Sequence, residues 1–236
     1  MFFLLFFKAQ NIHFVLFYKY KITKRYYSAH FLYISYFCAI ISNKGTMNTQ
    51  LYLVRHGETE ENVAQILQGR MPGHLTEKGK QQARDLAETL KRDYEPFDMM
   101  LVSDLQRTLD TANIINERLH IAQLLPYPLL RERDWGDFTG IDIMYARTHE
   151  MPENAESVEQ MFSRARLFLN TIFTQYANKR VLAVGHGLFN RTILAAYQGR
   201  TIRDIPRIEN AEVRHITITH PTLLQASAND DLVSAN

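Results

Sequence analysis

The fold of this chain is decided by one stretch of sequence, Leu51-Tyr52-Leu53-Val54-Arg55-His56-Gly57-Glu58-Thr59. Four consecutive apolar residues that end in charged ones are typical of a strand buried on both faces. The same pattern recurs at residues 99–102 and 181–184. The sequence therefore predicts at least three buried strands, each followed at once by polar residues.

Segments with a helical apolar period separate these strands. Ser103 and Ser157 each stand three residues before a glutamine, which is the spacing of a capping box, and Thr76 can cap another helix. A last helix is predicted to follow His186 and to stop at Gly199, a residue type that favours a left-handed cap. Alternating strands and helices predict one α/β domain, with a mostly parallel sheet covered on both faces. Residues 133–156 break the alternation and are expected to form a polar loop over the site.

The overall charge hides two unlike parts. The 236 residues carry 27 Lys+Arg and 25 Asp+Glu, a net charge of +2, which is too small to indicate a nucleic-acid partner. Residues 1–46 hold six of these basic residues, none of the acidic ones, and the one cysteine, Cys38. The rest of the chain is therefore net acidic and free of cysteine, although Arg55, Arg70, Arg107 and Arg131 are expected to concentrate positive charge around one site.

The leader at residues 1–46 fits no standard targeting segment. Its longest apolar run, residues 31–41, is shorter than the roughly 18 residues that a membrane span needs. Its basic cluster follows the first apolar run, the reverse of the order in a secretory signal. We interpret the leader as lying outside the working protein, which would start at Met47 and be cytoplasmic; an interfacial membrane anchor is the alternative. The expected domain is 47–222, followed by a frayed tail at 223–236.

Polar residues suited to catalysis follow the ends of separate strands. Because ligands of open α/β sheets bind beyond the carboxyl ends of the strands, these residues should meet in one place. The segment 124–130, which reads as an edge-like strand, delivers a carboxylate to the same edge. The candidate catalytic residues are Arg55, His56, Arg107, Glu132 and His186.

This set suits phosphoryl transfer. Arginines clamp phosphate oxygens with paired hydrogen bonds, a neutral imidazole can attack phosphorus, and a carboxylic acid can protonate the departing oxygen. The sequence contains no His-Glu-x-x-His, Gly-x-Ser-x-Gly or Gly-x-Gly-x-x-Gly motif, so it predicts no metal site, no serine hydrolase and no dinucleotide cofactor.

The ordered motifs resemble those of the histidine phosphatase (phosphoglycerate mutase-like) superfamily, and the chain is identified as a member of its phosphatase branch. The resemblance runs from about residue 51 to 219, through Arg55-His56-Gly57-Glu58-Thr59, Gln68-Gly69-Arg70, Ser103-Asp104-Leu105-Gln106-Arg107-Thr108, Leu130-Arg131-Glu132 and Gly185-His186-Gly187. It implies a three-layer α/β/α sandwich, whose one antiparallel strand residues 212–219 could supply, and catalysis without a metal or cofactor.

The resemblance also implies a role for each matching position. His56 would be the phosphorylated nucleophile and Glu132 the proton donor and acceptor. Arg55, Arg107 and His186 would bind the transferring phosphoryl group. The residues expected to line the same pocket are Thr59, Asn62, Gln68 and Gly69.

Hydrolysis is the favoured reaction. Mutases of the family carry Thr-Gly-Trp where this chain has Gln68-Gly69-Arg70, and they have a longer insertion around the site. A short lid shields a phosphorylated intermediate poorly from water. We therefore expect a metal-independent hydrolase that uses a phosphohistidine on a small phosphorylated metabolite. A phosphoglycerate mutase and a catalytically silent phosphate-binding module are the alternatives; the substrate and the oligomeric state stay open.

Overall fold

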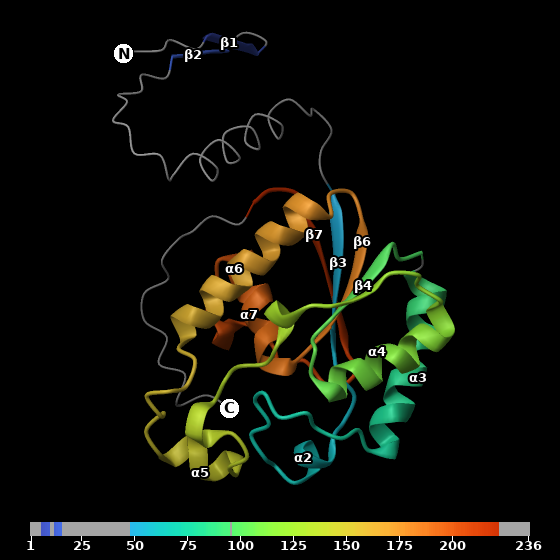
Figure 1. Ribbon diagram of the computed structural model, residues 1–236, viewed down its shortest axis with the longest axis vertical. Helices are drawn as coiled ribbons and strands as arrows, with labels where there is room; N and C mark the ends of the chain where they lie inside the picture. The colour runs from blue at the N-terminus through green and yellow to red at the C-terminus, as the bar shows by residue number, and fades with distance from the viewer. Residues whose placement is uncertain (1–5, 10–11, 16–47, 95, 222–236) are drawn as a thin grey trace, which may run out of the picture. The chain divides into compact units, whose positions relative to one another are not determined.

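The chain divides into two compact units, Met1–Thr46 and Met47–Asn236. A computed structural model describes residues 6–9, 12–15, 48–94 and 96–221 (Figure 1). In the first unit, β1 (Phe6–Ala9) and β2 (Ile12–Val15) pair in an antiparallel manner. Within the described part of the chain, no helix combines the length and the apolar character needed to cross a membrane. The expected tail at 223–236 lies outside the described residues, and the interpretation of residues 1–46 stays a prediction.

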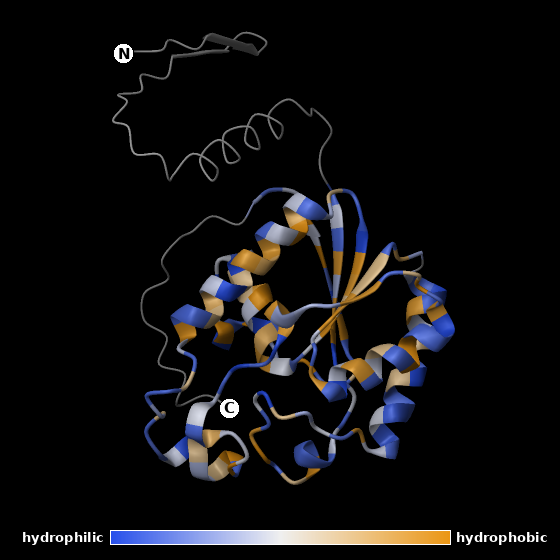
Figure 2. Cartoon of the chain, viewed as in Figure 1, coloured by the Kyte–Doolittle hydropathy of each residue, from blue (hydrophilic) through white to orange (hydrophobic). Residues whose placement is uncertain are grey.

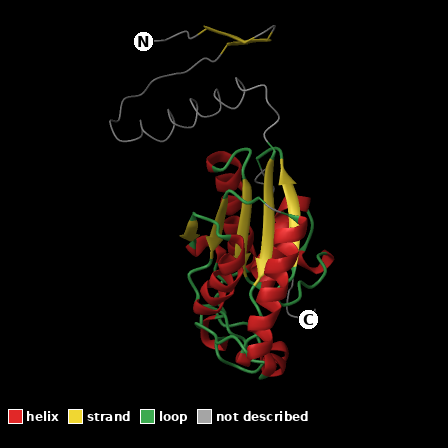
Figure 3. Cartoon of the chain, turned by 90° about the vertical axis from the view of Figure 1, so that its right-hand side faces the viewer, coloured by secondary structure: helices red, strands yellow, loops and turns green. Residues whose placement is uncertain are grey.

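The second unit is built on a five-stranded sheet in the order β5-β4-β6-β3-β7. Neighbouring strands run parallel except for β7, which is antiparallel to β3; its arrow at the right-hand edge of Figure 3 points against the others. The prediction of a mostly parallel sheet with one antiparallel strand is confirmed. The strands are β3 (Thr49–Arg55), β4 (Met99–Val102), β5 (Leu124–Pro126), β6 (Arg180–Gly185) and β7 (Val213–Ile218).

Helices form a layer on each face of this sheet (Figure 1). Alternate strand residues, among them Tyr52, Val54 and Met100, pack into one cluster with the apolar stripes of α3 (Glu77–Asp93) and α4 (Gln106–Leu119). The residues between them point to the other face, which α6 (Val158–Gln175) and α7 (Gly187–Gln198) cover. Figure 2 shows the apolar sides of these helices turned toward the sheet. The expected three-layer sandwich is therefore the observed architecture.

Most of the predicted helix ends are confirmed. The Thr76 side chain accepts a hydrogen bond from Gly79 N at 2.9 Å and caps α3. Ser157 forms the predicted capping box of α6 with Gln160, because both reciprocal bonds are present. Gly199 ends α7 in the left-handed conformation, with φ of 63°.

The capping box predicted at Ser103 and Gln106 is wrong. Helix α4 begins at Gln106 after Leu105, and no side chain caps it. Ser103 N donates to Val184 O at 2.9 Å, so the pairing of β4 with β6 extends one residue beyond the apolar run. The Ser103 hydroxyl does not cap α4, and its Oγ instead lies 2.8 Å from His186 Nε2.

The segment at residues 133–156 contains more structure than the loop we predicted. It holds a 3₁₀ turn at Gly136–Phe138 and helix α5 (Ile143–Thr148), which Asp142 caps through Met144 N and Tyr145 N. Because Ala146 is the buried residue of α5, this helix carries no apolar stripe that its sequence could reveal. The remaining short elements are α2 (Glu60–Val63), η1 (Pro128–Leu130) and η3 (Ile202–Asp204).

Candidate active site

A cavity of about 180 Å³ opens beyond the carboxyl ends of β3, β4 and β6. Strand β3 ends at Arg55 and is followed by His56, whereas β6 ends at Gly185 and is followed by His186. The predicted site residues that line this cavity are Arg55, His56, Asn62, Gln68, Gly69, Arg107 and Glu132.

Two glycines fix the turn that carries His56. A Cβ built on Gly57 would lie 2.4 Å from Gly79 O, and one built on Gly79 would lie 2.0 Å from Glu58 O. The turn can therefore pack directly against the first turn of α3 only because both residues lack a side chain. Gly57 N also donates to Thr111 Oγ1 of α4 at 3.1 Å. These contacts hold the His56 backbone against the two helices.

The ring of His56 is held in its neutral form. Its Nδ1 lies 2.7 Å from Gly57 O. Because a carbonyl oxygen can only accept, Nδ1 must carry the proton and Nε2 must carry the lone pair. Burial, and then the charges of Arg107 and Arg55, hold the pKa of His56 well below its ordinary value. The ring therefore stays unprotonated at neutral pH.

His186 lies behind His56 rather than in the cavity wall. The two ring centroids are 5.4 Å apart, and the His186 side chain is fully buried. Its Nε2 lies 2.8 Å from Ser103 Oγ, while Nδ1 has no hydrogen-bond partner among the described residues. Burial, followed by the charge of Arg107, lowers the pKa of this ring well below its ordinary value.

Two buried arginines bring cationic groups to His56. Arg55 Nη1 donates to Ile208 O at 2.8 Å, and Arg107 Nη2 donates to Gly69 O at 2.8 Å. Burial lowers the pKa of Arg107 to about 10, so the guanidinium remains charged at neutral pH. The Nε atoms of both arginines are buried without a partner among the described residues. Such orphaned donors are costly unless an acceptor reaches them, which points to an anionic ligand in the cavity.

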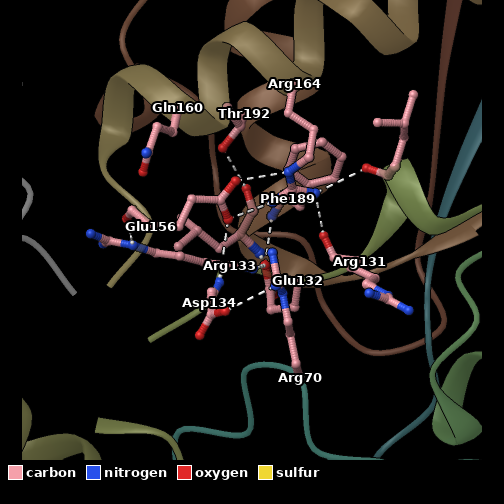
Figure 4. A network of polar contacts seen from close by, with 12 residues as sticks. Arg70, Arg131, Glu132, Arg133, Asp134, Glu156, Gln160, Arg164, Phe189 and Thr192 are labelled. Carbon is pink, nitrogen blue, oxygen red and sulfur yellow. Dashed lines mark hydrogen bonds and ion pairs between the residues drawn. The ribbon is translucent and has the colours of Figure 1, made fainter. Parts of the chain in front are cut away.

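Glu132 faces the cavity at the N-terminus of α7. Its Oε1 accepts from Arg133 N at 2.9 Å and from Phe189 N at 3.0 Å (Figure 4). Its Oε2 accepts from Leu188 N at 3.1 Å. Backbone donors at a helix N-terminus suit a carboxylate. The carboxyl group is therefore held in one place from two segments of the chain.

The predicted pocket-lining residues fall into two groups. Asn62, Gln68 and Gly69 line the cavity, and Asn62 Oδ1 also accepts from Asn210 Nδ2 at 3.2 Å. Thr59 does not line it: this buried residue caps α2 by accepting from Asn62 N at 3.1 Å. Thr59 therefore sets the position of Asn62 instead of facing the cavity itself.

Two arginines that we expected around the site are engaged elsewhere. Arg70 forms an ion pair with Asp134 at 2.9 Å, and Arg131 donates through Nε to Asp104 Oδ1 at 2.7 Å. Neither lines the cavity. Asp134 and Asp104 are distant from these arginines in the sequence. Their carboxylates pair with the positive charges that we expected at the site.

Sequence reasoning missed three other arginines in the cavity lining, Arg147, Arg191 and Arg207. Arg191 was discoverable, because it stands about one turn into the helix that follows His186, much as Arg107 follows β4. Arg147 and Arg207 carry no such signal, since one lies on the short helix α5 and the other in a loop. Within the described ranges, no group of three or more His, Cys, Asp or Glu side chains is arranged to hold a metal ion.

Comparison with known proteins agrees with this geometry. The chain is 36% identical over 155 residues to the "Uncharacterized phosphatase PhoE" of Bacillus subtilis (strain 168), covering 64% of this chain and 78% of that protein. It is 33% identical over 165 residues to the "Probable phosphoglycerate mutase GpmB" of Proteus mirabilis (strain HI4320), covering 64% of this chain and 75% of that protein. The solved structure of Bacillus stearothermophilus YhfR matches with a TM-score of 0.67 and 27% identity, covering 79% of this chain and 99% of that one. Residues 51–231 match the family model of the histidine phosphatase superfamily (branch 1), and the chain belongs to that superfamily.

Proposed function

We propose that this protein is a phosphatase that hydrolyses a small phosphomonoester through a phosphohistidine at His56. One observation carries the proposal: a neutral, buried imidazole with its Nε2 lone pair free lies beside two arginines whose buried Nε donors lack partners. A phosphate group would supply the acceptors that these donors lack. The relatives named as phosphatases support the same reaction class.

In the first step, the Nε2 lone pair of His56 attacks phosphorus, and the bond to the ester oxygen breaks. Arg55 and Arg107 stabilise the charge on the phosphoryl oxygens. The step requires Glu132 to carry a proton, which it gives to the departing oxygen, so that an alcohol and not an alkoxide leaves. The products of the step are the alcohol and phosphorylated His56.

In the second step, water attacks the phosphoryl group, and the bond between nitrogen and phosphorus breaks. Glu132, now a carboxylate, takes the proton from that water. Inorganic phosphate leaves, and both His56 and Glu132 return to their starting states. Because the arginines supply the positive charge, we propose that the reaction needs no metal ion.

Hydrolysis is favoured over mutase chemistry because the outer edge of the cavity is exposed; we call this edge the rim (Ile66, Trp135, Ile143, Arg147 and Arg207). A mutase has to keep the phosphorylated intermediate away from water while its substrate turns over. Here Arg147 is exposed and the Arg207 side chain is 72% exposed, although both line the cavity. Water can therefore reach the phosphoryl group. A relative named as a probable mutase keeps this alternative testable, through an enolase-coupled assay with bisphosphoglycerate present.

The rim also limits the kind of substrate. Arg147, Arg191 and Arg207 line the cavity beyond the phosphate site, although Arg207 also lies 4.0 Å from the Glu209 carboxylate. Among the described lining residues, Glu132 is the one acidic side chain. Apolar side chains such as Trp135 and Ile143 share that lining. We therefore infer a small phosphorylated metabolite that carries a second anionic group.

The decisive experiment compares three proteins on p-nitrophenyl phosphate, each with and without a chelator. Wild-type protein should be active in both conditions, and His56→Ala should lose at least about a thousandfold in kcat. The matched control is His74→Ala, since His74 is an exposed histidine outside the cavity lining and pairs with Glu61. Full activity of His56→Ala, or complete loss of wild-type activity on chelation, would contradict the proposal. Trapping base-stable phosphohistidine on wild-type protein would further exclude a silent phosphate-binding module.

A further inference from the structure

The position of Glu132 depends on how two segments of the chain are held together. Its carboxylate accepts backbone hydrogen bonds from Arg133 on its own segment and from Leu188 and Phe189 on α7. If the segment around Glu132 moved relative to α7, the carboxylate would lose part of this support. The contacts that tie the two segments therefore decide where the proton donor stands.

Arg164 of α6 makes those contacts (Figure 4). Its Nη1 donates to Leu129 O at 2.9 Å and to Arg131 O at 2.6 Å, just ahead of Glu132 in the chain. Its Cζ lies 3.6 Å from the centroid of the Phe189 ring, an interaction between a cation and an aromatic face. One guanidinium thus contacts both segments that support the Glu132 carboxylate.

Glu156 fixes the guanidinium of Arg164 in turn. Its two oxygens accept from Arg164 Nε at 2.8 Å and from Nη2 at 2.7 Å, and the side chains of the pair are 10% and 13% exposed. The backbone oxygen of Glu156 accepts from Arg133 Nε at 2.8 Å, which anchors the residue directly after Glu132. A two-pronged pair of this kind sets an orientation as well as a distance.

We propose that Arg164 and Glu156 are positioning residues for the proton transfer by Glu132. The proposal rests on the proposed function, in which Glu132 protonates the departing oxygen. A nearly buried ion pair often gives little net stability compared with apolar residues. Holding the carboxyl group at the departing oxygen gives this pair a role in the reaction.

Two esters with different leaving groups can distinguish a role of Arg164 and Glu156 in positioning Glu132 from a general role in folding. When the ester bond breaks, p-nitrophenolate can depart without a proton, because it is a weak base. Phenolate is a stronger base and needs the proton from Glu132. A variant that misplaces Glu132 should therefore lose more activity on phenyl phosphate than on p-nitrophenyl phosphate. A variant that merely unfolds part of the protein should lose the same fraction on both.

The experiment measures kcat/KM for the two esters in competition, so the fraction of folded enzyme cancels from the ratio. Glu132→Gln gives the full effect of losing the proton donor. Arg164→Gln and Glu156→Gln should each lower the ratio of phenyl to p-nitrophenyl activity by about tenfold or more. Arg164→Lys, which keeps the charge but not the planar fork, should lie between these variants and wild type. The control on the same helix is Ile172→Val, a buried change that should leave the ratio unaltered.

Two results would overturn the proposal in distinguishable ways. If Glu132→Gln lowers the ratio while Arg164→Gln and Glu156→Gln leave it at the wild-type value, the pair does not position Glu132 and the proposed function stands. If wild-type protein hydrolyses neither ester, the proposed function fails and this inference fails with it. Should Arg164→Gln not fold, Arg164→Lys and Glu156→Gln carry the same comparison.

Discussion

The two sides of the cavity are built by different means. The nucleophile wall (Arg55, His56 and Arg107, with His186 behind them) is buried, and backbone groups hold its side chains. The rim (Ile66, Trp135, Ile143, Arg147 and Arg207) comes from loops and short helices, and its arginines reach into solvent. We therefore expect the nucleophile wall to determine the rate of the reaction and the rim to determine which substrate binds. Changes in the nucleophile wall should alter the rate and its pH dependence, whereas changes in the rim should alter affinity.

After the loss expected for His56→Ala, the largest effect should come from Arg107→Gln in the nucleophile wall. Loss of its charge removes stabilisation of the phosphoryl oxygens, so kcat/KM should fall by roughly a hundredfold to a thousandfold. Arg107 also contributes, after burial, to the low pKa of His56. Removing this cation raises that pKa, and His56 must be neutral to attack. The acidic limb of the pH profile of kcat/KM should therefore move to higher pH in the variant.

The control for this experiment is Arg84→Gln, an exposed arginine on α3 outside the cavity. Its pH profile should overlay that of wild type. If the pH profile of Arg107→Gln keeps the wild-type acidic limb, this cation does not lower the pKa of His56. The nucleophile wall would then control the pH dependence no more than the rim does.

The nucleophile wall could be predicted from the sequence because its residues lie at the end of an apolar strand, directly after one, or in the first turn of the helix that follows. Four apolar residues in a row mark both the strand and the place where it ends. The sequence could therefore predict that His56 and His186, which follow two such strands, lie near each other. The prediction for Ser103 failed because the backbone pairing of β4 extends one residue beyond the apolar run. Apolar patterning reports burial of side chains, and it does not report where the last backbone hydrogen bond falls.

The rim could not be predicted, because tertiary contacts between distant segments place it. Ile66 bridges to Asp142, and Leu67 N donates to Ile141 O at 2.9 Å. No local pattern marks residues 66 and 142 as neighbours. A tertiary contact also explains why the expectation for Arg70 was wrong. Its charge suggested a site residue, but it pairs with Asp134, which is distant in the sequence.

The second prediction concerns acid stability, to which the two buried histidines of the nucleophile wall should contribute together with His215, whose pKa burial also lowers. His56 and His186 are buried with a pKa well below the ordinary 6.5, chiefly because of burial. The unfolded chain therefore binds protons that the folded chain does not. Stability should be complete above about pH 6.5 and should fall as the pH drops below it, by up to about 1.4 kcal/mol per pH unit for each histidine.

Urea unfolding at a series of pH values checks this expectation. His56→Gln should lose part of the slope of stability against pH between about pH 6.5 and 5. His74→Gln, which changes an exposed histidine, should keep the wild-type slope. A wild-type stability that does not change over this range would contradict the buried, neutral state of the two rings.

The third prediction concerns selection by the rim. Arg207→Gln should raise KM for a carboxyphenyl phosphate by about threefold to tenfold and leave kcat near its wild-type value, because an exposed cation contributes modest attraction to a second anionic group. KM for phenyl phosphate, which lacks the carboxylate, should change less. Arg200→Gln, an exposed arginine beyond the end of α7, is the matched control. An equal change in KM for both esters would argue against a second anionic group in the substrate.

The smallest effect should come from the ion pair between Arg70 and Asp134, which joins residues 68–71 to the segment at 133–156. The two side chains are 43% and 34% exposed, and pairs in such surroundings contribute little net free energy. The rim is held mainly by backbone bonds instead, among them Gly140 N to Leu67 O at 2.8 Å. A double-mutant cycle with Arg70→Gln and Asp134→Asn should therefore give a coupling of about 0.5 kcal/mol in unfolding free energy, and each variant should change kcat less than about twofold. A coupling several times larger would mean that a side-chain ion pair fixes the rim as firmly as backbone contacts fix the nucleophile wall. In that case the rim would be a preformed part of the catalytic apparatus, and the division of roles between the nucleophile wall and the rim would not hold.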